Sequence, residues 1–255
     1  MRELDHWDAA SQKVADIELN VITFREPNPE PSHRDLSAMT TAIGDTNTPQ
    51  RQSTRGEPAW EIATLFPRQG AWSEAAYLAL PSNRLLELND GCLEVLPIPT
   101  YFHELIVEFL YDLLRAFVRD RGLGKVMRAQ LPIRLWDGQM REPDVLFLSP
   151  NRVQQLAKAG NRAQPDGADL VMEVVSPGVQ HRERDLDVKR FEYARAGIPE
   201  YWIVDPELRT ITVLQLAGTT YQVAGIFNAT QSAMSVLIPG FTVSVEAAFR
   251  AAEET

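Results

Sequence analysis

The segment LVMEVV at residues 170–175 constrains the fold of this 255-residue chain more than any other segment. A strand with one solvated face alternates apolar and polar residues. This segment is apolar on both sides of its single glutamate, which indicates a strand in the interior of a sheet. A carboxylate there is costly to bury unless it is paired, protonated or bound to a metal. Glu173 is therefore a candidate site residue, and the alternative is an acid at the end of the strand that reaches solvent or pairs with an arginine.

Asp144 extends the candidate site to the preceding strand. It follows Glu142-Pro143. A proline disfavours a helical conformation at the residue before it, here Glu142, and it suits the first position of a strand. Taken alone, Pro-Asp is usually a turn. Beside a buried Glu173 on the next strand, Asp144 instead completes a pair of carboxylates that suits Mg²⁺ or Mn²⁺. Mg²⁺ takes one or two carboxylates and fills its other positions with water and substrate phosphate.

Lys189 is the candidate for a third catalytic group. Leu186, Lys189 and Tyr193 recur at spacings of three and four on a predicted helix over 182–196, so Lys189 lies near the side that should meet the sheet. There its amine would orient the attacking water and offset charge that grows on a phosphate in the transition state. The alternative is an exposed helical ion pair between Asp185 and Lys189.

Two further residues are supporting candidates around this site. His103 opens a predicted helix over 101–118, at the edge of its apolar stripe, and Glu87 lies in a predicted hairpin over 85–95. A hydrogen-bonded structural role explains either residue as well. From residue 115 to residue 141 there are seven lysines and arginines and two aspartates, a local charge of +5. A solvated face is the default explanation, and this stretch is also the best candidate for phosphate contact.

Composition excludes several classes of protein. The net charge of −10 argues against a protein that coats nucleic acid, because such a chain repels a polyanion except where its basic groups gather. One cysteine and four histidines argue against a structural zinc site. No apolar run is long enough to span a membrane, and the N-terminus lacks the pattern of a secretory signal. We therefore expect a cytoplasmic protein with no membrane partner.

Proline content divides the chain into two parts. Residues 26–58 contain five prolines and no aromatic residue, too little apolar surface to offset the entropy of ordering. We expect residues 1–58 to form a largely disordered N-terminal extension, with one possible short strand over 17–24. The folded domain is expected at 59–250.

Hydrophobic periodicity and turn residues predict a mixed domain. Helices are expected over 72–80, 101–118 and 182–196, a hairpin over 85–95, strands over 126–135, 145–148, 169–175, 201–204 and 210–216, and edge strands over 221–223 and 241–245. This order predicts an α/β or α+β fold with a central sheet flanked by helices.

The motifs in this order resemble a known family. They are His103 at the start of its helix, Pro143-Asp144-Val145, DLVMEVVSP at 169–177, Asp185, Lys189, Tyr193, GIPEYWIVDP at 197–206, and also ELNDG at 87–91 and IPGF at 238–241. Over about residues 70–245 the chain resembles the Uma-two family of restriction-endonuclease-like proteins, which are common in bacteria.

The resemblance implies the PD-(D/E)xK nuclease fold, in which a mixed sheet lies between helices. It implies that Asp144 and Glu173 are the two acids of the motif, hold a divalent cation and serve the hydrolysis of phosphodiester bonds in DNA. The usual lysine two positions after the second acid is replaced by Val175. Either Lys189 supplies the amine from the helix, or the chain is a catalytically degenerate nuclease fold that binds nucleic acid or protein.

Other chemistry fits the sequence less well. A glycosidase that uses the same acid pair would need a groove rich in tryptophan or tyrosine, and none is evident near either acid. Ser176 and Lys189 as a nucleophile pair would lack the glycine-rich strand–turn–helix elbow. The oligomeric state cannot be read from the sequence, although nucleases with one site often cut two strands as a homodimer.

Overall fold

The structure is a computed structural model, and it describes residues 67–80, 85–160, 163–178 and 182–253. The expected extension over 1–58 and its possible strand lie outside these described residues. Within them, no helix is long and apolar enough to cross a membrane.

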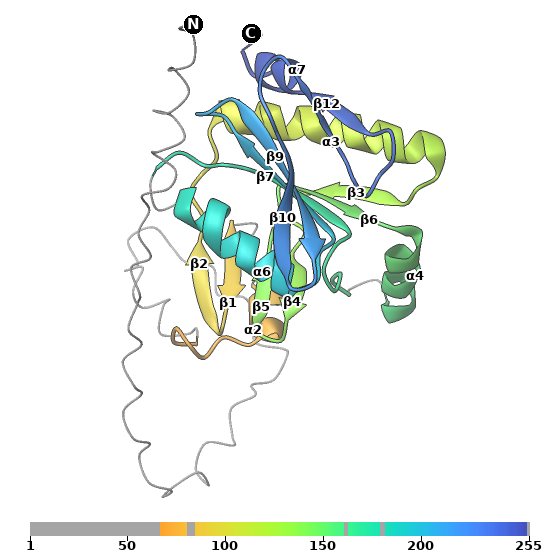
Figure 1. The fold of residues 1–255 in the computed structure, drawn as a ribbon. Coiled ribbons are helices and arrows are strands. Elements are labelled where there is room, and N and C mark those ends of the chain that lie inside the picture. The colour runs from red at the N-terminus through yellow and green to blue at the C-terminus, as the bar shows by residue number, and fades with distance from the viewer. Residues whose placement is uncertain (1–66, 81–84, 161–162, 179–181, 254–255) are drawn as a thin grey trace, which may run out of the picture. The chain divides into compact units, whose positions relative to one another are not determined.

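The described elements are helices interspersed among runs of short strands (Figure 1). The helices are α2 (Glu74–Leu78), α3 (Tyr101–Arg121), α4 (Pro150–Ala159), the π-helix η2 (Arg184–Val188), α6 (Lys189–Arg195) and α7 (Val245–Arg250). The strands are β1 (Leu86–Asn89), β2 (Cys92–Val95), β3 (Lys125–Arg128), β4 (Ile133–Trp136), β5 (Gln139–Arg141), β6 (Val145–Leu148), β7 (Leu170–Val174), β8 (Glu200–Asp205), β9 (Thr210–Ala217), β10 (Thr220–Phe227), β11 (Ser232–Met234) and β12 (Thr242–Ser244).

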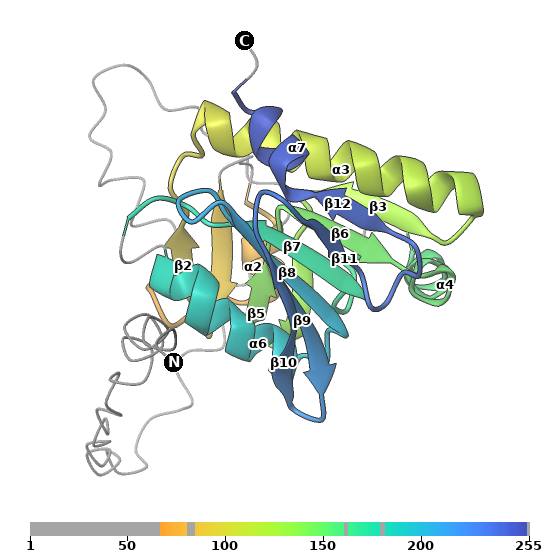
Figure 2. The same ribbon diagram turned by 45° about the horizontal axis from the view of Figure 1, so that its top comes forward.

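A six-stranded mixed sheet in the order β10-β9-β8-β7-β6-β3 forms the centre of the domain. Only β7 and β8 are parallel within it, and η2 with α6 makes the crossover between them. Val145 and Met172 point to the core under α3 and α7, whereas Leu146 and Val171 point to the core under α6. Figure 2 shows the sheet between these two helical layers. The predicted α+β fold, with a central sheet flanked by helices, is confirmed.

A second sheet, in the order β2-β1-β5-β4, is antiparallel throughout. Its β1–β2 hairpin turns at Asp90 and Gly91, whose φ angles of 44° and 77° match the asparagine-, aspartate- and glycine-rich turns that join adjacent strands. The predicted hairpin over 85–95 is therefore confirmed. Glu87, which lies on β1, is completely buried.

Helix α3 begins and ends with strong capping residues. The Thr100 hydroxyl accepts a hydrogen bond from the N–H of His103, and Gly122 adopts the left-handed conformation that ends the helix. Ile106 and Leu110 on its apolar side are completely buried against the sheet. This confirms the predicted helix, extends it to Arg121, and places His103 in its first turn.

The predicted single strand over 126–135 is wrong. The chain leaves the large sheet after β3, passes Gln130 with a φ of 77°, and enters the small sheet as β4 after Pro132. The apolar alternation at Leu131, Ile133 and Leu135 belongs to the second half alone, and Pro132 inside the expected strand was a usable signal of the break. Helix α4 was not predicted, because none of its residues is fully buried and it contains few apolar residues.

Gly124 offers a test of this packing. A Cβ at this position would lie 2.1 Å from the carbonyl oxygen of Leu148, whereas a Cβ at Gly138 would meet no atom within 4 Å, and both glycines have positive φ. We expect Gly138→Ala to cost about 1 kcal/mol of unfolding free energy from backbone strain, and Gly124→Ala at least about 2 kcal/mol more from displaced backbone. Urea denaturation measures both, and equal costs would contradict the packing.

Candidate active site

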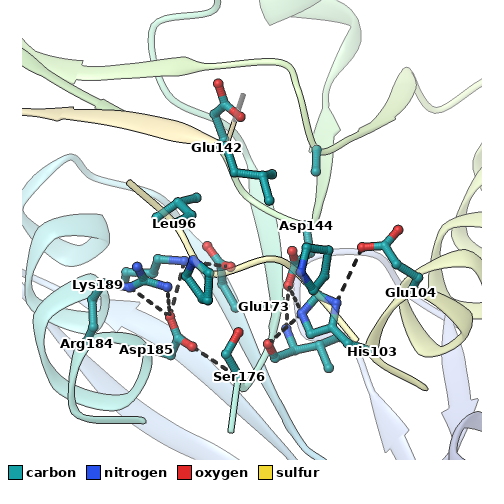
Figure 3. Close-up of a pocket in the computed structure, with 15 residues that line it drawn as sticks. Leu96, His103, Glu104, Glu142, Asp144, Glu173, Ser176, Arg184, Asp185 and Lys189 are labelled. Carbon is teal, nitrogen blue, oxygen red and sulfur yellow. Dashed lines mark hydrogen bonds and ion pairs between the residues drawn. The ribbon is translucent and has the colours of Figure 1, made fainter. Parts of the chain in front are cut away.

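The pairing of β6 with β7 brings the two predicted acids together. Val145 pairs with Met172 in antiparallel register, so the next positions along, Asp144 and Glu173, face each other on the same side of the sheet. Oδ2 of Asp144 accepts a hydrogen bond of 2.7 Å from the N–H of Val174. Both carboxylates therefore lie where β6 begins and β7 ends, on the side of the sheet that α6 covers (Figure 3).

Lys189 joins these acids from the helix. Its Nζ lies 2.8 Å from Oε2 of Glu173 and 3.3 Å from Oδ1 of Asp185, and its side chain is 4% exposed. The Tyr193 hydroxyl donates to the other oxygen of Glu173 at 2.5 Å. The interpretation of Asp185 and Lys189 as an exposed surface pair is therefore wrong, because burial and the third charge of Glu173 make it an internal network.

The π-helical turn η2 explains how one helix presents both Asp185 and Lys189 to the sheet. The carboxylate of Asp185 accepts from the N–H of Ser176 at 3.2 Å, and its backbone carbonyl accepts from the Tyr201 hydroxyl at 2.8 Å. Lys189 begins the α-helical part immediately afterwards. The sequence predicted a continuous helix over 182–196 and did not reveal this wide turn, a feature that is frequent at functional sites.

Burial and mutual charges determine the protonation of the cluster. Burial, together with the charges of Asp144 and Asp185, raises the pKa of Glu173 to about 7, although Lys189 opposes the shift. Burial would also raise the pKa of Asp144, but the hydrogen bond and charge of His103 and the charge of Lys189 lower it. Burial disfavours charged Lys189, yet Glu173 and Asp185 outweigh it and raise its pKa, so the amine stays protonated.

His103 holds the carboxylate of Asp144 from the opposite side. Its Nε2 lies 3.0 Å from the carbonyl oxygen of Val174 and 3.4 Å from Oδ2 of Asp144. Burial disfavours the charged imidazole, but the hydrogen bond and charge of Asp144 raise the pKa of His103 to about 9. These contacts agree with the hydrogen-bonded role at a core edge, and they also place His103 in contact with a candidate site residue.

Glu87 lies behind the site in a network around the completely buried Arg141. The Arg141 guanidinium donates to Glu87 at 2.8 Å and Glu94 at 2.6 Å, and makes two bonds to Glu192 of α6 at 2.7 and 2.8 Å. Arg141 is therefore not part of a solvated basic face, which corrects the interpretation of that stretch. Glu87 supports the strand beside the site and does not line the pocket itself.

The acids and Lys189 line a pocket of about 50 Å³, large enough for a few water-sized groups. Arg184 also lines it and was not predicted, although its position beside Asp185 on the same helix was a usable signal. Glu104, Glu142 and Asp185 also line the pocket. Burial raises the pKa of Glu142 to about 7, but its carboxylate points away from Asp144 and Glu173 (Figure 3).

The donor chemistry of this pocket fits a hard cation that keeps most of its own water. Among the described residues, no group of three or more histidine, cysteine or acidic side chains is arranged to hold a metal. The two facing carboxylates of Asp144 and Glu173 are oxygen ligands of the kind and number that Mg²⁺ takes in phosphate-handling sites.

Comparisons with known proteins agree with this arrangement. A family model described as "Uma2: Putative restriction endonuclease" matches residues 74–246, which include every predicted site residue. The chain belongs to the Uma2 family. A crystal structure from Anabaena variabilis, titled a "putative nuclease belonging to DUF820", shares the fold with a TM-score of 0.59 at 16% sequence identity. The match covers 71% of this chain and 98% of that one, and a search of curated proteins found no match.

Removal of Arg141 tests the network that supports this Uma2-family site. Arg141→Ala leaves Glu87 and Glu192 buried without their counter-charge, so we expect a loss of about 3–5 kcal/mol in unfolding free energy. Arg119→Ala is the control, because the ion pair of Arg119, which is 70% exposed, should contribute less than about 1 kcal/mol. Chemical denaturation measures both, and similar losses would contradict the structural importance of the network.

The raised pKa of His103 predicts how stability changes with pH. A group whose pKa is higher in the folded state stabilises the fold below its unfolded value, here 6.5, and this contribution is lost as pH rises through about 9. We expect the stability advantage of the wild type over His103→Asn to shrink by up to about 3 kcal/mol across that range. Denaturation at a series of pH values measures it, and a constant difference would contradict the shift.

Proposed function

We propose that this chain is a Mg²⁺-dependent endonuclease that hydrolyses phosphodiester bonds in DNA. The observation that carries the proposal is the convergence of three groups from separate elements. Asp144 faces Glu173 across two strands, and the Lys189 amine lies 2.8 Å from the Glu173 carboxylate. Membership of the Uma2 family supports the reaction class, because the description of that family names a restriction endonuclease.

Asp144 and Glu173 would hold the cation. A bound Mg²⁺ would polarise the scissile phosphate and lower the pKa of an attacking water. The chain's own contribution is to fix its ligands beforehand: the Val174 N–H and His103 hold Asp144, and Tyr193 and Lys189 hold Glu173. Fixed ligands reduce the reorganisation needed when substrate binds.

Lys189 and Arg184 supply the positive charge that faces the phosphate. Both side chains line the pocket, and both are paired with Asp185, which holds them in place. Lys189 remains protonated, so it acts as a hydrogen-bond donor to the attacking water or to a phosphate oxygen. This arrangement compensates for Val175 at the usual lysine position, where the side chain is 3% exposed and packs in the core.

One observation favours the competing function, a non-catalytic binding module. Both carboxylate oxygens of Glu173 already accept hydrogen bonds, from Lys189 and Tyr193. If these contacts leave no carboxylate oxygen of Glu173 accessible to a cation, Glu173 is a structural acid and the pocket binds no metal. Titration calorimetry with Mg²⁺ and Mn²⁺ separates the two functions, since the module predicts no heat of binding.

Substitution of the two acids tests catalysis directly. We expect Asp144→Asn and Glu173→Gln each to lower Mg²⁺-dependent plasmid nicking by at least about 100-fold, because each removes a ligand charge while keeping the shape of the side chain. Nicking is measured by gel electrophoresis of supercoiled DNA, with and without chelator.

The matched control is Asp187→Asn. It removes an exposed acid from η2, the π-helix beside the site, at a position that does not line the pocket. Its nicking rate should equal that of the wild type. Circular dichroism confirms that all three variants are folded. Equal nicking by the wild type, Asp144→Asn and Glu173→Gln would overturn the assignment of the site.

A further inference from the structure

A second, larger groove lies at the free edge of the six-stranded sheet. It measures about 580 Å³, and its lining residues come from the C-terminal end of α3, the edge strand β3 and α4. Its floor is apolar, with Val118, Val126 and Val153 among its lining residues. Three basic side chains, Arg115, Arg119 and Lys125, line it, and no acidic side chain does so among the described residues.

The basic side chains continue from this groove towards the candidate active site. Arg115 and Arg128 lie over the ring of Tyr111, with 5.6 and 5.9 Å between each guanidinium carbon and the ring centroid. The ring holds both cations in place through cation–π contact and leaves their N–H groups available. The next residue, Ala129, lines the active-site pocket, and its N–H donates to the Asp144 carbonyl oxygen at 3.0 Å.

Strand pairing gives the distance between groove and pocket. Arg128 pairs with Val145, the residue after Asp144, and Lys125 pairs with Leu148 at the other end of the strand. Three residues of strand span roughly 10 Å. Successive nucleotides of one DNA strand rise by about 3.4 Å along the helix axis, so this distance corresponds to about three nucleotides.

We infer that this groove binds the phosphate backbone of DNA about three nucleotides from the bond that is cut. The inference rests on the proposed function, and it identifies the surface that positions the substrate. The groove is complementary in charge to DNA. The chain has a net charge of −10, but the described residues that line this groove include three cations and no acid, so its surface is locally positive. Backbone contacts of this kind orient DNA on a protein without reading its sequence.

Two neighbouring features limit how much each cation contributes. Arg119 is paired with Asp120 at 3.2 Å, so Arg115 and Lys125 are the principal phosphate ligands in the groove. Gly122 ends α3 at the groove, and its N–H already bonds to carbonyl groups of the last turn, so the negative end of the helix dipole there opposes a phosphate. The competing explanation is that Lys125 serves only to prevent pairing of the exposed edge strand with another chain.

The test is binding of a short fluorescent DNA duplex, measured by anisotropy in the presence of chelator so that no cleavage occurs. We expect the double variant Arg115→Gln, Lys125→Gln to bind more weakly and to lose about two from the slope of log affinity against log salt. Because the wild type then loses affinity faster as salt rises, the ratio of its affinity to that of the variant should fall by roughly tenfold between about 50 and 200 mM salt.

The matched control is the double variant Arg68→Gln, Lys158→Gln. It removes the same charge from exposed positions that do not line the groove. Its slope should equal that of the wild type. An equal slope for the groove variant and the wild type would overturn the inference, as would a wild type that does not bind the duplex.

The nicking assay keeps this inference separate from the proposed function. Glu173→Gln should bind the duplex with the salt slope of the wild type while it fails to nick. If Glu173→Gln nicks normally, the assignment of the site fails, and the anisotropy of the groove variant still decides whether the groove binds DNA. A groove variant that aggregates but binds with an unchanged slope would show that Lys125 only protects the edge strand.

Discussion

The buried guanidinium of Arg141 is the interaction on which the geometry of the domain depends. It bonds to Glu87 of β1, Glu94 of β2 and Glu192 of α6, and so joins the small sheet to the helix that carries Lys189. A buried charge cluster of this kind is stable only while every partner is present. The small sheet, which contributes no catalytic side chain to the proposal, thereby sets the position of α6 above Glu173.

The sequence predicted the large features of the fold because each had a local physical cause. Thr100 and Gly122 cap α3, and a turn with positive φ at Asp90 and Gly91 closes the hairpin. Pro132 pointed to a break between β3 and β4, but the sequence could not predict that the two halves pair in different sheets. Pairing partners are a tertiary property that periodicity does not encode.

The candidate site was predictable to a similar extent. An acid inside an apolar strand identified Glu173, and the proline before Asp144 placed that residue at a strand start. The sequence could not predict that Glu173 bonds to both Lys189 and Tyr193, because the π-helical turn that aims Lys189 has no simple residue pattern. Arg141 was assigned to a solvated basic face, because burial of an arginine depends on three acids that are far apart in the sequence.

The π-helical turn also has a consequence for how such proteins change over time. An i→i+5 turn holds one residue more than an α-helical turn, so the helix before it and the helix after it are out of phase by about 100°. Deletion of one codon within 186–188 would rotate Lys189 and Tyr193 away from the sheet while Asp185 kept its anchors on Ser176 and Tyr201. A change of one residue in length is therefore more damaging here than most substitutions.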